Sequence, residues 1–156
     1  MSELVIGALL IVCLTAAAEA GEARSEDAAV RWRGDAVELE TAAARLRLDL
    51  GGGALRRVAW VNRRTGTDLL GGRAIEDFAL IVDGERVSSG APGWTVGEPS
   101  CETLEHGELL LRLPLSRGGV EVMRFYVLHP GISLVRGWLQ IANRGQAEVT
   151  VGDPPV

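Results

Sequence analysis

Apolar and polar side chains alternate one by one along short stretches of this chain, and no other pattern in it narrows the possible folds as far. In the segment 44–50 (ARLRLDL), every second residue is a leucine, with arginine or aspartate between the leucines. Successive side chains of a β-strand point to opposite faces of its sheet, so this segment has one apolar and one charged face. The pattern predicts a strand with one face in a hydrophobic core and the other in water.

Similar segments follow along the chain, each ended by residues that favour turns. Asp83-Gly84, between two extended runs, predicts a hairpin because both residues tolerate the positive φ that such a turn requires. The segment 36–47 contains three consecutive alanines and could compete as a helix, but its alternating valine and leucines favour two strands joined at the alanines. The remaining expected strands are 55–61, 74–82, 85–87, 94–96, 108–115, 120–128, 132–142 and 147–151. Strands at intervals of about ten residues predict an all-β fold, an antiparallel β-sandwich or barrel.

The N-terminal end resembles a secretory leader. Residues 4–18 form an apolar run that is shorter than the about 20 residues of a transmembrane helix. Small residues follow it, and cleavage after Ala18 or Ala20 fits the pattern of a signal peptide, although Glu3 stands where a basic residue is usual. Val12 precedes Cys13, whereas a lipoprotein signal has a small residue there, so we expect no stable membrane anchor. We expect a signal peptide at 1–20, a flexible mature N-terminus at 21–34, a β-sandwich domain at 35–156, and a secreted or periplasmic location.

Length and charge exclude several classes of protein. The chain has 156 residues, enough for one domain, and its formal net charge is −5. All 16 basic residues are arginines, and they are scattered rather than clustered. A nucleic-acid-binding surface needs a basic stripe and a positive net charge, so we expect no nucleic-acid partner.

The usual motifs of catalysis and cofactor binding are missing from the sequence. A phosphate-binding P-loop needs a lysine, and the chain has none. The segment 131–135 (GISLV) lacks the second glycine of a nucleophile elbow. Cys101, Glu105 and His106 lie close together, but a structural zinc site needs four convergent ligands. We therefore expect no catalytic residue, no metal and no cofactor, and we interpret Cys101 as a buried, inert thiol.

The four tryptophans are the more informative set, because sugar rings stack on flat aromatic faces, although tryptophan also fills cores. Trp60 shares its strand face with Val58 and is expected in the core. Trp138 shares its face with Arg136 and Gln140, opposite Val135, Leu139 and Ile141. Trp138, Arg136 and Gln140 are therefore the candidate carbohydrate-binding residues. The alternative is that this face packs against a neighbouring domain.

The segment 120–145 resembles part of a known family. A hydrophobic strand with a tyrosine is followed by Pro130-Gly131 and by a strand that runs through Arg136 and Trp138 into an Asn-Arg-Gly turn. This order is similar to the N-terminal β-supersandwich domain of α-galactosidase-type (family 36, melibiase-like) glycoside hydrolases, a sandwich of the galactose mutarotase type. The resemblance covers roughly residues 35–151. It implies that the catalytic aspartates lie in a following (β/α)₈ barrel, which this sequence does not contain. Such supersandwiches are usually longer than the 136 residues that follow the expected leader, so we expect an incomplete one.

These observations lead to one leading hypothesis and two alternatives. The leading hypothesis is a secreted, non-catalytic, carbohydrate-associated β-sandwich whose partner is a carbohydrate or a glycosidase catalytic domain. The first alternative is an interaction module that docks a partner domain through its edge strands and the Trp138 face. The second is a small aldose epimerase that acts through His129 and a carboxylate.

Overall fold

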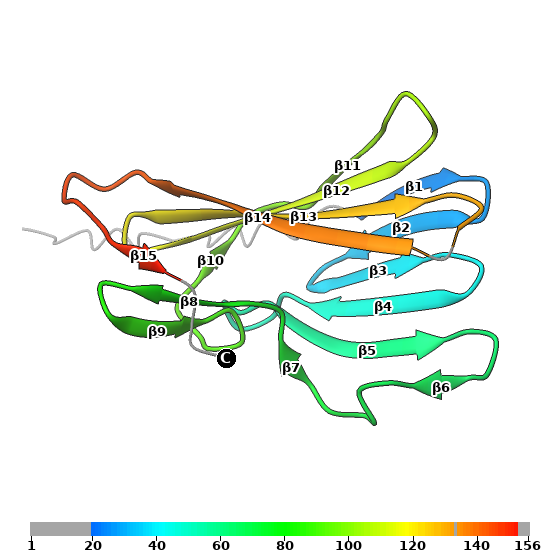
Figure 1. Cartoon of the computed structure of the whole chain (residues 1–156), viewed down its shortest axis with the longest axis horizontal. Helices are drawn as coiled ribbons and strands as arrows, with labels where there is room; N and C mark the ends of the chain where they lie inside the picture. The colour runs from blue at the N-terminus through cyan, green and yellow to red at the C-terminus, as the bar shows by residue number, and fades with distance from the viewer. Residues whose placement is uncertain (1–19, 133, 153–156) are drawn as a thin grey trace, which may run out of the picture.

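The computed structural model describes residues 20–132 and 134–152, which fold entirely as strands and connecting turns, without a helix (Figure 1). The strands are β1 (Gly21–Ser25), β2 (Ala28–Arg33), β3 (Ala36–Glu40), β4 (Ala44–Asp49), β5 (Arg56–Asn62), β6 (Thr67–Asp68), β7 (Ile75–Glu76), β8 (Ala79–Val82), β9 (Glu85–Ser88), β10 (Thr95–Val96), β11 (Ser100–Thr103), β12 (Leu109–Arg117), β13 (Val120–His129), β14 (Leu134–Asn143) and β15 (Val151–Gly152). All the strand pairings given below are antiparallel.

The seven-stranded sheet has the order β1-β2-β3-β4-β5-β6, and β7 pairs with the other end of β5. In β4 the alternation seen in the sequence is confirmed, since Leu46 and Leu48 are buried and Arg47 is exposed. Charged side chains on the opposite face form ion pairs, as between Arg31 and Glu38 at 3.3 Å. This sheet therefore supplies one wall of the core.

The five-stranded sheet has the order β10-β12-β13-β14, with β11 also paired to β12. Its long strands extend across the molecule in Figure 1, so that one end faces the seven-stranded sheet and the other approaches the small sheet β15-β8-β9. The predicted hairpin between β8 and β9 is confirmed, because Asp83 and Gly84 have φ values of 50° and 82°. Among the described residues, the strand β14 pairs with β13 alone and forms an edge of the sheet.

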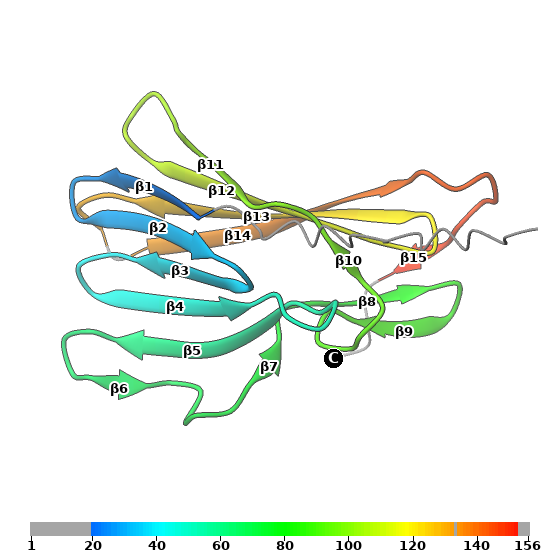
Figure 2. The same cartoon turned by 180° about the vertical axis from the view of Figure 1, so that it is seen from behind.

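The core lies between the sheets, and the sandwich predicted from the sequence is confirmed. Its largest fully buried aliphatic side chains come mainly from the two large sheets, namely Val30, Val37, Leu39, Leu48, Leu55, Leu109, Leu111, Leu113, Val122 and Leu128. Trp94 is buried and Trp60 packs against the same cluster. Figure 2 shows the layers from behind, with β1–β6 on one side and the long strands β12–β14 crossing the molecule.

The prediction of a flexible segment at 21–34 was wrong, because these residues form β1 and β2. Val30 is fully buried and Arg31 binds Glu22 across the two strands at 2.9 Å. The turn between them places Asp27 where its carboxylate accepts the backbone N–H of Gly131 at 2.7 Å. The charged side chains of these strands, such as Glu22 and Arg24, lie on the outer face of the paired strands, where they remain in water.

The expected leader falls largely outside the described residues. The apolar run, Cys13 and the cleavage position Ala18 all lie within residues 1–19, and Ala20 is exposed next to β1. Within residues 20–132 and 134–152, no helix is long and apolar enough to cross a membrane.

Asp77 lies where the chain passes from β7 to β8, and its wholly buried carboxylate joins the seven-stranded and five-stranded sheets. It accepts hydrogen bonds from Arg57 of β5 and Arg124 of β13, each at 2.6 Å, and from the Tyr126 hydroxyl. Burial, together with the charge of Asp77, raises the pKa of Tyr126 well above its usual value. These contacts fix β13 relative to β5 of the seven-stranded sheet.

Candidate functional site

The outer face of the five-stranded sheet carries an aromatic pair at its centre. Phe125 of β13 and Trp138 of β14 are directly opposite each other in the strand register. Their rings stack with centroids 4.9 Å apart and planes 10° from parallel. The Trp138 side chain keeps an exposed fraction of 39 %. Because Phe125 packs against one face of the indole, the exposed surface of Trp138 lies on its other face and rim.

The structure places the three predicted site residues on this same face. Arg136, Trp138 and Gln140 are alternate residues of β14 and oppose outward-facing residues of β13. The Arg136 guanidinium carbon lies 5.9 Å from the Trp138 ring centroid. Gln140 lies beyond Trp138 in the other direction and opposes Met123. The polar face predicted from strand parity is therefore present, with the aromatic ring between two polar groups.

A small hollow lies on the Arg136 side of Trp138. Its volume is about 390 Å³, and its lining comprises Leu104, Glu108, Val127, His129, Arg136 and Trp138. His129 Nδ1 lies 3.9 Å from Glu108 Oε1. The hollow thus combines an indole ring, a guanidinium, an imidazole and a carboxylate.

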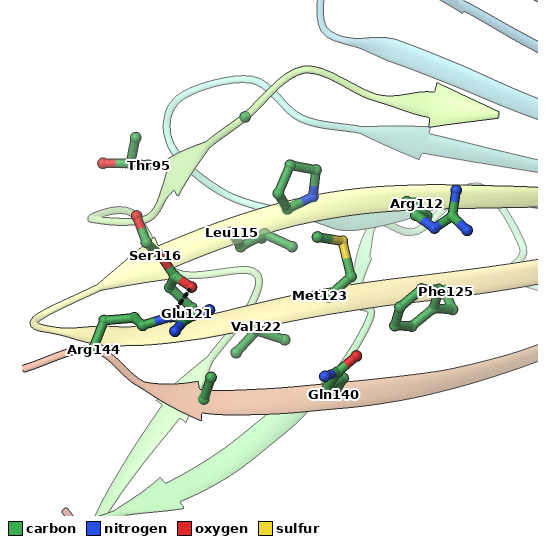
Figure 3. A pocket seen from close by; sticks show the side chains of 13 residues that line it. Thr95, Arg112, Leu115, Ser116, Glu121, Val122, Met123, Phe125, Gln140 and Arg144 are labelled. Carbon is green, nitrogen blue, oxygen red and sulfur yellow. Dashed lines mark hydrogen bonds and ion pairs between the residues drawn. The ribbon is translucent and has the colours of Figure 1, made fainter.

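A larger hollow of about 550 Å³ lies on the other side of the aromatic pair. Figure 3 shows Met123, Phe125 and Gln140 on the neighbouring strands β13 and β14, with Arg112 on β12 beside them. The same view shows Glu121 paired with Arg144, whose Nε–Oε2 distance is 2.9 Å. The hollow therefore has apolar and aromatic side chains between polar groups, which is the usual composition of a small-molecule site, and both hollows have the size of one.

Charges on this face are largely balanced by ion pairs. The guanidinium of Arg112 donates to Glu102 on the neighbouring strand β11, and this hydrogen bond lowers the pKa of Glu102. Arg144 is paired with Glu121. Arg136 has no carboxylate within 4.0 Å among the described residues. One guanidinium beside Trp138 is thus available to a ligand.

On the inner side of β14, Gly137 permits the close approach that holds this strand. A Cβ atom at this position would lie 2.9 to 3.1 Å from the guanidinium atoms of Arg124. Arg124 also packs over the Tyr126 ring at 4.3 Å and is bound by Asp77. The buried Asp77 contacts therefore position the backbone directly beneath the Trp138 side chain.

The other residues considered for chemistry are separate from one another. Within the described part of the chain, no group of three or more His, Cys, Asp or Glu side chains is arranged to hold a metal ion. Cys101 is partly buried on β11, and burial, together with the nearby Glu102 carboxylate, raises its pKa to about 11. Its placement fits a thiol of low reactivity.

Sequence reasoning missed Phe125, Glu108 and Arg112 as members of this face. Phe125 could have been found by pairing the two strands around Pro130-Gly131, which brings residue 125 opposite residue 138. Glu108 directly precedes β12 and Arg112 lies on it, and pairing this strand with β13 around Gly118-Gly119 could have found them.

Comparison with known proteins gives no match: no protein family, no curated protein and no solved structure is significantly similar to this chain.

Proposed function

We propose that this protein is an exported, non-catalytic β-sandwich that binds carbohydrate on the outer face of its five-stranded sheet. The observation that carries this proposal is the Trp138 ring, which is supported on one face by Phe125 and stays 39 % exposed. A sugar ring has an apolar face of C–H groups that packs on an indole, and hydroxyl groups at its rim that need hydrogen-bond partners. Arg136, Gln140, His129 and Glu108 supply such partners around the ring.

The resemblance to the N-terminal domain of α-galactosidase-type hydrolases supports the same proposal and adds a candidate partner. In that reading, the sandwich would hold a carbohydrate for a glycosidase catalytic domain, which performs the hydrolysis. Galactose and α-galactosides are therefore the first ligands to test.

Calorimetric titration of the full chain with galactose, α-galactosides and a panel of neutral glycans tests the proposal. We expect saturable binding that is lost in Trp138→Ala. Ile141→Ser is the matched control, because Ile141 lies on the same strand with a similar exposure of 36 % but on the opposite face. No detectable binding to any ligand of the panel, or binding that is retained in Trp138→Ala, would contradict the proposal.

The free edge of β14 favours a second candidate, an interaction module. This strand has ten residues, has one neighbouring strand and exposes Leu134 and Ile141. Exposed edges of this length are templates for pairing with another chain. In that case, the chain would bind a purified α-galactosidase-type barrel, and Ile141→Glu would break the complex. Titrations with glycans would show no binding.

The His129–Glu108 pair favours the remaining alternative, aldose epimerisation. Ring opening needs one group to take the proton of the anomeric hydroxyl and another to protonate the ring oxygen as the C–O bond breaks. A histidine and a carboxylate 3.9 Å apart beside an indole could do both. Polarimetry of fresh α-D-galactose tests this function, which requires accelerated mutarotation that His129→Ala abolishes.

A further inference from the structure

The two hollows lie on one continuous sheet face, on either side of the aromatic pair. The small hollow is lined by Val127 and His129 of β13, and the large one by Glu121, Met123 and Phe125 of the same strand. Along β14 the lining continues from Arg136 and Trp138 to Gln140 and Ala142. The same two strands therefore pass beneath both hollows.

The combined length of the two hollows exceeds that of a single sugar. From His129 to Glu121 there are eight residue steps along β13. At about 3.4 Å a step, this distance is about 27 Å, which is several sugar units long. A ligand confined to the Trp138 ring would leave the larger hollow, of about 550 Å³, empty.

The charge pattern of this face matches a neutral ligand. Arg112 is paired with Glu102 and Arg144 with Glu121, and the His129 imidazole lies 3.9 Å from Glu108. A chain with a carboxylate on every unit would face Glu102, Glu108 and Glu121 with only Arg136 left to bind it. Like charges placed close together on a binding face oppose association.

We propose that the face from His129 to Glu121 binds a linear, neutral oligosaccharide of several units that passes the Trp138 ring and occupies both hollows. This inference rests on the proposed carbohydrate-binding function and names its ligand class. Hydroxyl groups of the units in the large hollow contact Gln140 and the ion-paired rim, while Met123 and Phe125 pack against the ring faces.

Titration of the full chain with oligosaccharides of increasing length tests this inference. The probes are neutral galacto-, manno-, gluco- and xylo-oligosaccharides from one to six units, and oligogalacturonides of the same lengths. We expect the affinity for neutral hexasaccharides to exceed that for the matching single sugar by about tenfold or more. The units in the second hollow add contacts, whereas the ligand loses its translational and rotational freedom only once.

Two variants in the large hollow separate the length effect from the Trp138 contact. Met123→Ala removes an apolar contact, and Ala142→Trp fills the hollow; Met123 lies on β13 and Ala142 on β14. Each variant should lower hexasaccharide affinity toward that of the single sugar and leave single-sugar binding unchanged. Trp138→Ala should lower both affinities. Circular dichroism that matches the parent chain shows that each variant is folded.

The outcomes distinguish this inference from the function on which it rests. Equal affinity for all lengths, or affinities unchanged in Ala142→Trp, would overturn the extended site while carbohydrate binding stands. Tighter binding of oligogalacturonides than of neutral chains would overturn the assignment of a neutral ligand. No detectable binding of any probe would overturn the proposed function and the extended site together.

Discussion

The Asp77 carboxylate accepts a hydrogen bond from Arg124 Nε at 2.6 Å, and both side chains are buried between the two large sheets. Arg124 in turn lies against Gly137 of β14, the strand that presents Trp138 on its outer face. The proposed binding face is therefore supported from inside by a charged contact rather than by apolar packing alone.

Asp77→Ala should destabilise the protein by about 3 kcal/mol or more, because it leaves the buried guanidinium of Arg124 and the half-buried one of Arg57 without their partner. Urea unfolding followed by circular dichroism measures this loss. The control is Glu121→Gln, which breaks an exposed ion pair with Arg144 and should have a much smaller effect. Equal effects of the two substitutions would show that the buried contacts contribute no more than a surface pair.

Gly137→Ala should cost about 1 to 3 kcal/mol, the usual range for overpacking a core. The added methyl group would meet the Arg124 guanidinium at 2.9 Å, and Asp77 prevents that guanidinium from moving away. A double-mutant cycle with Arg124→Met checks the cause. In the Arg124→Met background, Gly137→Ala should lower stability by less than it does in the parent chain. If the stability losses of the two substitutions simply add, the clash of the alanine methyl group is not with Arg124.

Cys101 should react slowly with iodoacetamide at pH 8. With its pKa raised from 9.0 to about 11, its thiolate fraction at this pH falls about a hundredfold. The higher intrinsic nucleophilicity of such a thiolate restores about tenfold, so the net slowing is about tenfold before steric effects. Mass spectrometry of timed samples measures the rate with and without urea. Labelling at the same rate in the folded and unfolded chain is the contrary result.

Acid should loosen the contact between the β1–β2 turn and the β13–β14 turn. The hydrogen bond from Gly131 lowers the pKa of Asp27 below its usual 3.8, and the bond from Ala42 adds to this effect. A carboxyl group with a lowered folded pKa stabilises the fold above its unfolded pKa. That stabilisation is lost as the pH falls through the lower, folded value.

Unfolding measured between pH 6 and pH 2 checks this acid effect. Stability should fall below about pH 4 in the parent chain, and Asp27→Asn should lose less over this range because its amide does not titrate. An NMR titration of the Asp27 carboxyl that gives a pKa at or above 3.8 would remove the basis of this prediction.

The sequence predicted those parts of the fold that depend on local alternation. The buried leucines of β4, the Asp83-Gly84 hairpin and the polar face of Trp138 each follow from residue spacing or turn chemistry within a few positions. The strands β1 and β2 escaped prediction, because their charged residues are stabilised by cross-strand ion pairs such as Arg31–Glu22 rather than by a clear apolar stripe.

The candidate site was predictable only in part, because several of its residues lie on strands that are distant in the sequence. Arg136, Trp138 and Gln140 lie on one strand, so parity alone places them together. Phe125, Arg112 and Glu102 join them through the pairing of β13 with β14, of β12 with β13 and of β11 with β12. The buried Asp77 lies 47 residues from Arg124 in the sequence, and no local pattern connects them.

The side-chain N–H signals of the four tryptophans provide the most direct test of carbohydrate binding at Trp138. Trp94 is buried and donates its indole N–H to the Ser88 carbonyl, and Trp32 and Trp60 pack against the core, so these three serve as internal controls. In ¹⁵N-resolved NMR spectra, titration with a neutral oligosaccharide should shift the Trp138 indole signal saturably and leave the other three in place. An unmoved Trp138 signal across the whole glycan panel would contradict the account.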